Sequence, residues 1–301
     1  MESATTAPLI IPERLLGKSF GSLGLKVVQE EIAAAGSTNR AQIAQRVCRR
    51  LNWQTPGGQD QLMSTRVGLL KLHRAGLIPL PPPVRGNGNG RKIRWRDVAL
   101  PPAESICLSV EQLTGLRVEP VEGKEKSSLY NALMERYHYL GYTPMAGAQV
   151  RYLIVWEGGL LGAIGFGAAA WKVAPRDLFV GWTPLVREAN LHRIVNNARF
   201  LILPWVRCAN LASKVLSLCS RRIPKDFQEA YGYAPVLLET FVERGRFRGH
   251  CYRAAGWRLV GQTQGRGKLH RRSEPGVPVK DVWVYPLDRR FREKLLAGRG
   301  R

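Results

Sequence analysis

The sequence predicts a mixed α/β (α+β) core preceded by a small helical domain. Apolar residues recur at helical spacing in three short segments between residues 20 and 80. Beyond a stretch rich in proline and glycine, short apolar runs alternate with helical segments toward the C-terminus. The chain has 301 residues, 45% of them hydrophobic. This is enough for one sizeable core and an accessory domain.

The accessory domain is expected over residues 20–98. Its three helices are GLKVVQEEIAAAG, NRAQIAQRVCRRLNW and QLMSTRVGLLKLHRAG. Apolar residues lie on one face of each, and Gly36 ends the first. Ser37 and Asn39 are of the types that cap a following helix.

The third of these helices is basic. It carries Arg66, Lys71 and Arg74 beside an apolar face at residues 67–70, and RKIRWRDV (91–98) follows as a wing strand. Three helices with a basic third one predict a winged-helix-like nucleic-acid-binding domain, whose third helix enters the major groove. The alternative is an ordinary three-helix bundle with a solvated basic face.

A proline- and glycine-rich linker is expected over residues 79–104, overlapping the wing, and the core domain over 105–301. SSLYNALMERYHYLGY is a helix ending near Gly141, and the chain then turns at residues 157–159 between two apolar strands. DLFVGWT is expected as a third strand and RIVNNARFLILPWV as a long buried one. The later expected elements are a helix at 209–232, a strand at 236–242, a helix at 250–256, strands at 257–263 and 281–287, and a terminal helical segment at 288–296.

This order of elements is the layout of the Gcn5-related acetyltransferase (GNAT) fold. In that fold a ligand's pyrophosphate rests on the N-terminus of the helix after the long strand, where free amides and the helix dipole favour anions. The fold class predicted is therefore a GNAT-like mixed sheet behind a winged-helix-like domain.

The charge of the chain indicates a polyanionic partner. Forty-six Lys and Arg against 23 Asp and Glu give a net charge of +23 and a pI near 10.5, which favours nucleic acid, DNA before RNA. We expect no membrane partner, because no run approaches the ~18 apolar residues of a spanning helix. The N-terminus lacks the layout of a signal peptide, so a cytoplasmic protein is expected. The five scattered cysteines form no CxxC pair and indicate reduced thiols.

Several motifs resemble a known family. HYLGY, RYLIVW, GFGAAAWK, NNARFLILPWV, NLAS, YGYAPVLLETFV, CYRAAGW and GQTQGRG occur in one order over about residues 130–290. Together they are similar to the core domain of the DruA family of Druantia anti-phage defence systems, whose relatives lie beside mobile elements. More distantly, NLAS and YRAAGW resemble the GNAT-like phage Mom DNA-modification proteins. The resemblance implies a role in defence or mobile-element biology, with partner proteins from such systems.

Two segments are candidates for phosphate contacts. RCANLA (207–212) stands where acyl-CoA-binding relatives have Arg/Gln-x-x-Gly-x-Gly/Ala, with asparagine in place of the middle glycine. The glycine-rich basic loop at residues 265–272 suits a nucleic-acid backbone. The phosphate-binding candidates of the core are Arg199, Arg207, Asn210, Ser213, Arg248, Arg253, Arg266, Lys268 and Arg271.

The acid–base candidates are Glu239, Asp177, His138 and Tyr252. Glu239 ends a central strand and, with Asp177, is a candidate pair of ligands for Mg²⁺. The alternative is that Glu239 only pairs with an arginine nearby in sequence. His138 follows a helix between two tyrosines and is a candidate base or stacking group. Tyr252 stands where acetyltransferases have a tyrosine general acid, and Cys251 beside it is expected to pack in the core.

Four functions remain open from the sequence. The first is a DNA-binding defence or mobile-element protein whose GNAT-like core acts on or clamps nucleic acid. The others are a metal-dependent nuclease or transposition factor, a Mom-like base-modifying transferase that uses an acyl-CoA, and a non-enzymatic DNA- or RNA-binding adaptor.

Overall fold

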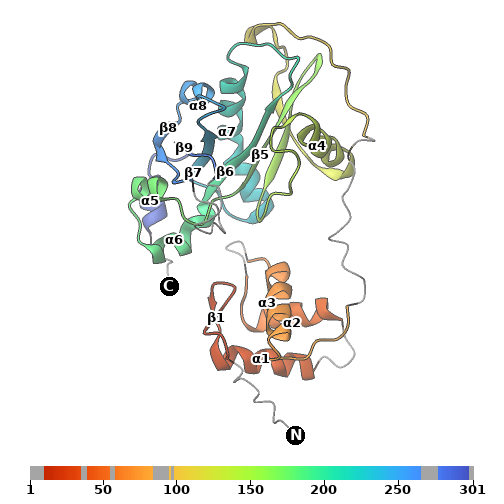
Figure 1. Cartoon of the computed structure of the whole chain (residues 1–301), viewed down its shortest axis with the longest axis vertical. Coiled ribbons are helices and arrows are strands. Elements are labelled where there is room, and N and C mark those ends of the chain that lie inside the picture. Colours follow the sequence, from red (N-terminus) through yellow and green to blue (C-terminus); the bar gives the residue numbers. More distant parts are fainter. Residues whose placement is uncertain are drawn as a thin grey trace. The chain divides into compact units, whose positions relative to one another are not determined.

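A computed structural model describes residues 10–34, 39–54, 58–83, 95, 98–265 and 277–297. The chain divides into two compact units, residues 1–92 and 93–301, of which the second carries the mixed sheet (Figure 1). Within the described ranges, no helix combines the length and apolarity needed to cross a membrane.

The first unit is a three-helix cluster with a short β-hairpin. Asn39 caps α2 as predicted, because its side chain accepts bonds from the amides of Ala41 and Gln42. The buried face of α3 differs from the prediction, since Thr65, Gly68, Leu69 and Leu72 are buried, whereas Val67 is 49% exposed. The predicted wing lies almost wholly outside the described residues. The elements are β1 (Arg14–Leu15), β2 (Lys18–Ser19), α1 (Gly21–Ala33), α2 (Arg40–Arg50) and α3 (Leu62–Arg74).

The second unit is a seven-stranded sheet in the order β3-β4-β5-β6-β7-β9-β8. Neighbouring strands are antiparallel except β6 and β7, which run parallel. The strands are β3 (Arg117–Pro120), β4 (Val150–Trp156), β5 (Gly159–Ala168), β6 (Ile194–Ile202), β7 (Leu237–Glu243), β8 (Arg258–Gln262) and β9 (Lys280–Pro286). The helices are α4 (Gly123–Tyr137), α5 (Ala174–Val180), α6 (Pro184–Asn190), α7 (Leu211–Tyr231), α8 (His250–Ala254) and α9 (Phe291–Leu296), with 3₁₀ turns at Val110–Gln112 and Leu191–Arg193.

Helices α4 and α7 cover opposite faces of the sheet. Successive side chains of a strand point to opposite faces. Arg151 of β4 bonds to Ser127 and Asn131 of α4, whereas the next residue, Tyr152, bonds to Asp226 of α7. This arrangement confirms the predicted GNAT-like mixed sheet.

The third strand predicted at residues 177–183 is wrong, because this segment lies in and after α5. Its apolar residues do not alternate across a sheet face: Leu178 is 85% exposed and Val180 is buried. Pro175 occupies the first turn of α5, a position that suits proline. The sheet instead gains β3, which the sequence analysis missed.

A buried ion pair fixes α5 against β7. The Arg176 and Glu239 side chains have no exposed surface, and Nη1 of Arg176 lies 2.7 Å from Oε2 of Glu239. The arginine also donates to the carbonyl of Ala170 and pairs with Asp177. The amide of Ala170 donates to the second oxygen of Glu239. Both charges are therefore compensated inside the protein.

Removing one partner of this pair is expected to destabilise the fold strongly. Arg176→Met leaves the Glu239 carboxylate buried and unpaired, which costs about 3–5 kcal/mol. Arg176→Met combined with Glu239→Leu is expected to recover most of this loss, as measured by urea unfolding. The control is Arg187→Met, which removes another arginine bound to Asp177 and leaves the buried pair intact. Equal stability of Arg176→Met and the parent chain would contradict the pairing.

Candidate functional site

A fork between β6 and β7 is the main feature of the site. The two strands pair only at Ile194, Val195 and Asn196, opposite Leu237, Leu238 and Glu239. Beyond that point β6 stays paired with β5 up to Ile202, and β7 stays paired with β9 up to Glu243. The strands therefore separate beyond Asn196 and Glu239 and leave the space between them to side chains.

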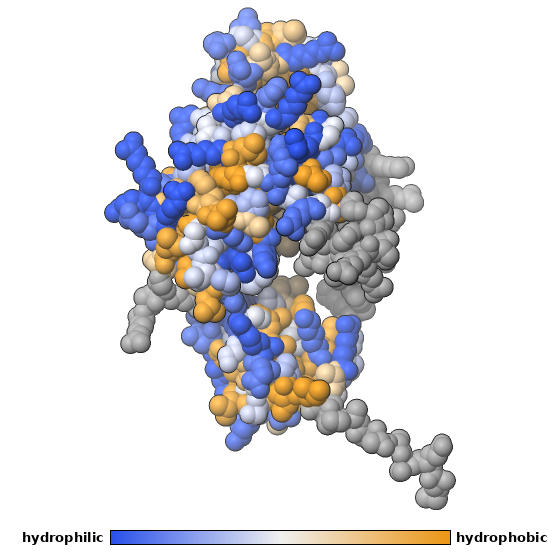
Figure 2. Space-filling view, turned by 60° about the vertical axis from the view of Figure 1, so that its left-hand side comes forward, coloured by the Kyte–Doolittle hydropathy of each residue, from blue (hydrophilic) through white to orange (hydrophobic). Residues whose placement is uncertain are grey.

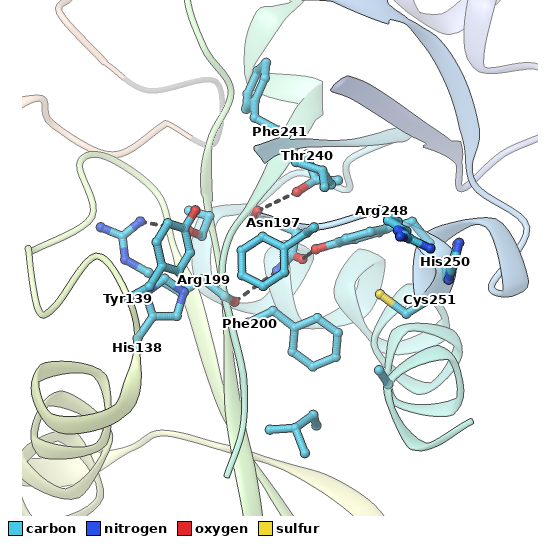
Figure 3. A pocket seen from close by; sticks show the side chains of 17 residues that line it. His138, Tyr139, Asn197, Arg199, Phe200, Thr240, Phe241, Arg248, His250 and Cys251 are labelled. Atoms are coloured by element: carbon cyan, nitrogen blue, oxygen red, sulfur yellow. Dashed lines mark hydrogen bonds between the residues drawn. The ribbon is translucent and has the colours of Figure 1, made fainter. Parts of the chain in front are cut away.

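A cavity of about 340 Å³ occupies this fork. Figure 3 shows His138, Tyr139 and Arg199 on one side of it and Arg248, His250 and Cys251 on the other. Its walls come from both faces of the sheet, because His138 follows α4 whereas Ala212 and Cys251 belong to α7 and α8. Phe200, Phe241 and Phe247 add aromatic surface.

A chain of buried hydrogen bonds closes the base of the fork. Thr240 Oγ1 donates to the carbonyl of Asn197 at 3.0 Å, and the Tyr252 hydroxyl donates to Asn197 Oδ1 at 2.7 Å (Figure 3). The side-chain amide of Asn197 donates to the Gly165 carbonyl. The register of β5 and β6 shifts at this point, and such bulges re-aim side chains. Burial raises the pKa of Tyr252, so its hydroxyl stays protonated.

The outer part of the cavity is aromatic and basic. Tyr139 packs edge-on against Phe247, with 5.3 Å between the ring centroids. Arg246 lies over the Tyr139 ring, and Arg248 at the rim is exposed. Aromatic faces and arginines together suit planar, electron-rich or anionic ligands.

His138 is held neutral beside this cavity. Its Nδ1 accepts a bond from the amide of Leu140 at 3.2 Å, so the remaining proton sits on Nε2. Burial, with a smaller contribution from Arg199, lowers the pKa of His138 to about 4. The side chain is thus a hydrogen-bond donor at neutral pH.

Glu239 and Asp177 do not line this cavity. Glu239 precedes Thr240, so it points to the other face of β7 and meets Arg176 there. Its partner is thus not one of the arginines nearby in sequence. Asp177 accepts bonds from Arg176, Trp182 and Arg187. Because cationic donors already hold both carboxylates, the residues present do not fit a Mg²⁺ ion. Within the described ranges, no group of three His, Cys, Asp or Glu has the geometry of a metal site.

The N-terminus of α7 begins beside the fork. Asn210 adopts a left-handed conformation with φ 61°, which glycine reaches without strain and asparagine tolerates. The Asn210 side chain makes no capping bond to α7. Ser213 instead donates to the Asn210 carbonyl. Both residues line a separate cavity of about 380 Å³ with Lys214.

The other predicted basic residues are spread over the chain. Arg66, Lys71 and Arg74 are exposed on α3, and Figure 2 shows hydrophilic side chains interspersed with hydrophobic ones on the visible surface of each unit. Arg207 is exposed before α7, and Arg253 of α8 lies over the Trp283 ring. Arg266, Lys268 and Arg271 lie outside the described residues.

Sequence reasoning therefore found part of the cavity. It selected His138, Tyr252, Arg199 and Arg248, which the structure brings together at the fork. It did not select Phe200 or Phe247, because isolated phenylalanines in strands and loops are indistinguishable from core residues. Asn197 carried a usable signal, since an amide inside an apolar strand needs a buried partner.

Fold and site together define a GNAT-like protein: a mixed sheet with a fork between its two parallel strands and a helix that begins beside that fork. The family model of the Druantia protein DruA matches residues 72–275. The chain belongs to this DruA family of anti-phage defence proteins, as its motifs predict. A search of curated proteins gives no match.

Several solved acetyltransferase structures align with part of the chain. An aminoglycoside acetyltransferase AAC(6')-Ib in complex with coenzyme A is 12% identical, with a TM-score of 0.37, covering 60% of this chain and 98% of its own. A spermidine N-acetyltransferase SpeG chimera from Vibrio cholerae and hSSAT is 11% identical, with a TM-score of 0.36 and the same coverage. A Bacillus subtilis acetyltransferase in complex with CoA is 9% identical, with a TM-score of 0.32, covering 57% of this chain and 98% of its own. At these scores no activity or residue role carries over.

Protonation of His138 is expected to make the fold sensitive to acid. Its pKa lies below the ordinary value of 6.5 in the folded state. The unfolded chain therefore takes up the proton first as the pH falls from about 6.5 to 4, and stability is lost over this range. Between pH 7 and 4.5, the free energy of unfolding measured in urea should fall by up to about 2 kcal/mol less in His138→Gln than in the parent chain. If the unfolding free energies of the two proteins changed in parallel over this range, the lowered pKa of His138 would be contradicted. Between pH 7 and 8.5 the two curves should run parallel, which is the internal control.

Proposed function

We propose that the protein binds nucleic acid, DNA in the first place, and that its GNAT-like core acts on or clamps the bound strand at the fork. The observation that carries this proposal is a difference between two helices of the first unit. On α2, Arg46, Arg49 and Arg50 pair with carboxylates. On α3, the exposed Arg66, Lys71 and Arg74 have no carboxylate partner among the described residues.

Surface cations that are not paired with carboxylates can be neutralised by the phosphates of a polyanion. The net charge of +23 disfavours the compact state through self-repulsion, and phosphates remove that repulsion. The aromatic and basic walls of the fork cavity supply stacking faces for bases and arginines for the backbone. The DruA family supports a role in anti-phage defence, for which phage or mobile-element DNA is the natural ligand and proteins of the same system are natural partners.

DNA binding is expected to depend steeply on salt. Each phosphate contact contributes roughly 0.9 to the slope of log K against log salt. Replacing Arg66, Lys71 and Arg74 by glutamine should therefore lower this slope by about 2–3, as measured by fluorescence anisotropy on duplex DNA from 50 to 300 mM salt. Single-stranded DNA and RNA of the same sequence test the choice of nucleic acid.

The matched control replaces Arg46, Arg49 and Arg50 by glutamine. It removes the same charge from the same unit, but from arginines already paired with carboxylates, so the slope should change less. Equal slopes for the parent chain and the α3 variant would refute the role of α3. Binding without any change in the DNA by mass spectrometry would identify an adaptor.

A second candidate function is an acyl-CoA-dependent, Mom-like transfer of a group to a base. The observation that favours it is the position of the fork beside the first turn of α7, where the amides of Ala212 and Ser213 have no intrahelical partners. Asn210 keeps the left-handed backbone that glycine would supply and adds a side chain. These amides would hold the pyrophosphate, and the cofactor would supply the acyl group.

This second function makes a separate prediction. Asn210→Gly should tighten acetyl-CoA binding by about tenfold, because removal of the side chain lets the pyrophosphate approach the backbone. Asn210→Asp should weaken binding, because it places a negative charge beside the phosphates. Isothermal titration measures both, and absence of acetyl-CoA binding by the parent chain and by Asn210→Gly would exclude the transferase.

A further inference from the structure

A second, polar cavity lies on the α4 face of the sheet. Its volume is about 230 Å³. Its floor is one row across three neighbouring strands, because Arg151 of β4 is the register partner of Gly165 of β5, and Gly165 is the partner of Arg199 of β6. Register partners share a face, so the two arginines flank a position without a side chain. Their backbones are about 9.5 Å apart, twice the strand spacing.

The Tyr130 hydroxyl fills the position above Gly165. A Cβ on Gly165 would collide with that hydroxyl, so the glycine leaves room for it. Tyr130 is only 2% exposed, and its hydroxyl has no hydrogen-bond partner among the described residues. Leaving a buried hydroxyl unpaired costs about 1–3 kcal/mol. A ligand atom that accepts this bond would remove the cost.

In the part of the chain that the structure describes, the two arginines also lack a counter-charge. Arg151 donates to the side-chain oxygens of Asn131 and Ser127, and Arg199 donates to the carbonyl of Ala198. All these partners are neutral. None of the described residues that line the cavity carries a carboxylate. The nearby Glu135 accepts from the amide of Tyr142 and is not part of its wall.

The chemistry of this cavity selects an oxyanion. Its floor and roof present hydrogen-bond donors, two of them guanidinium groups, and such charge-assisted bonds are the strong ones. Burial raises the pKa of Tyr130, so the hydroxyl remains a donor at neutral pH. Two uncompensated positive charges match a phosphate monoester, which carries about −1.5 to −2 at pH 7, better than a carboxylate.

We propose that Arg151, Arg199 and the Tyr130 hydroxyl form a binding site for a dianionic phosphate group, at the end of a nucleic-acid strand or on a free nucleotide. The strand form of this proposal rests on the proposed function, whereas the nucleotide form does not. Arg199 lines both this cavity and the one at the fork. A phosphate bound here therefore places the rest of its nucleotide toward the aromatic walls of the fork.

The experiment measures binding of inorganic phosphate to the full chain by isothermal titration at constant ionic strength. Tyr130→Phe removes only the hydroxyl and should weaken binding about tenfold, the effect of one hydrogen bond to a charged group. Arg151→Gln and Arg199→Gln should each weaken it at least as much. Tyr130→Phe removes an unpaired buried donor, so thermal unfolding should show that the fold is retained.

The matched control is Arg117→Gln, which removes one positive charge from β3, where Arg117 is paired with Glu119. Phosphate binding should be unchanged in this variant. Parent-like binding by Tyr130→Phe and Arg199→Gln would overturn the proposal, as would an equal loss in Arg117→Gln or the absence of phosphate binding by the parent chain.

Two further arms identify the source of the phosphate. Tighter binding of an oligonucleotide with a terminal phosphate than of the same strand with a terminal hydroxyl, lost in Tyr130→Phe, supports the strand form. Binding of a nucleoside monophosphate with no preference between the two strands supports the nucleotide form. Failure of DNA binding with retained phosphate binding would reject the proposed function and leave this site standing.

Discussion

The buried ion pair between Arg176 and Glu239 stands where the architecture of the sheet changes. Glu239 is opposite Asn196 in the last paired position of β6 and β7. One residue further, Thr240 and Asn197 face each other inside the fork. The pair ties α5 to β7 on one face, so the strand is held in place where it stops being supported by β6. The pair therefore lies at the position where the fork begins.

Hydrogen bonds, aromatic rings and arginines surround different parts of the fork. Neutral hydrogen bonds from Thr240 and Tyr252 to Asn197 close its base, and aromatic rings from three separate segments form its walls. On the α4 side, Arg199 also lines a second cavity, whose two arginines have no carboxylate partner among the described residues. The Thr240 and Tyr252 hydroxyls at the base are paired, whereas the Tyr130 hydroxyl above Gly165 has no hydrogen-bond partner among the described residues. We therefore assign a structural role to the hydrogen bonds at the base of the fork and a ligand-binding role to the cavity on the α4 face.

Much of the fold could be predicted from the sequence. The β4–β5 hairpin, the long strand β6, helix α7 and the order of elements after it follow from apolar periodicity and from turn residues such as Gly158 and Gly159. The third predicted strand failed because the short apolar run at residues 178–180 suits a strand as well as a helix, and only the structure places it in α5. Strand β3 was missed because four residues carry too little periodicity.

The site was predicted only in outline. Charge and residue type were enough to select His138, Tyr252 and Arg199. They did not show that Glu239 points away from Thr240 and the fork, or that Tyr130 and Arg151 lie together with Arg199.

The sequence by itself determined the family, the surplus of positive charge and most of the order of strands and helices, since these depend on local composition and on motifs. The tertiary structure decided which carboxylates are neutralised internally and which arginines have no carboxylate partner among the described residues. The physical reason is that pairing of charges depends on strand register and on the face of the sheet. In this chain, residues 63 positions apart make the buried ion pair, and a glycine on the strand between two arginines makes room for a hydroxyl.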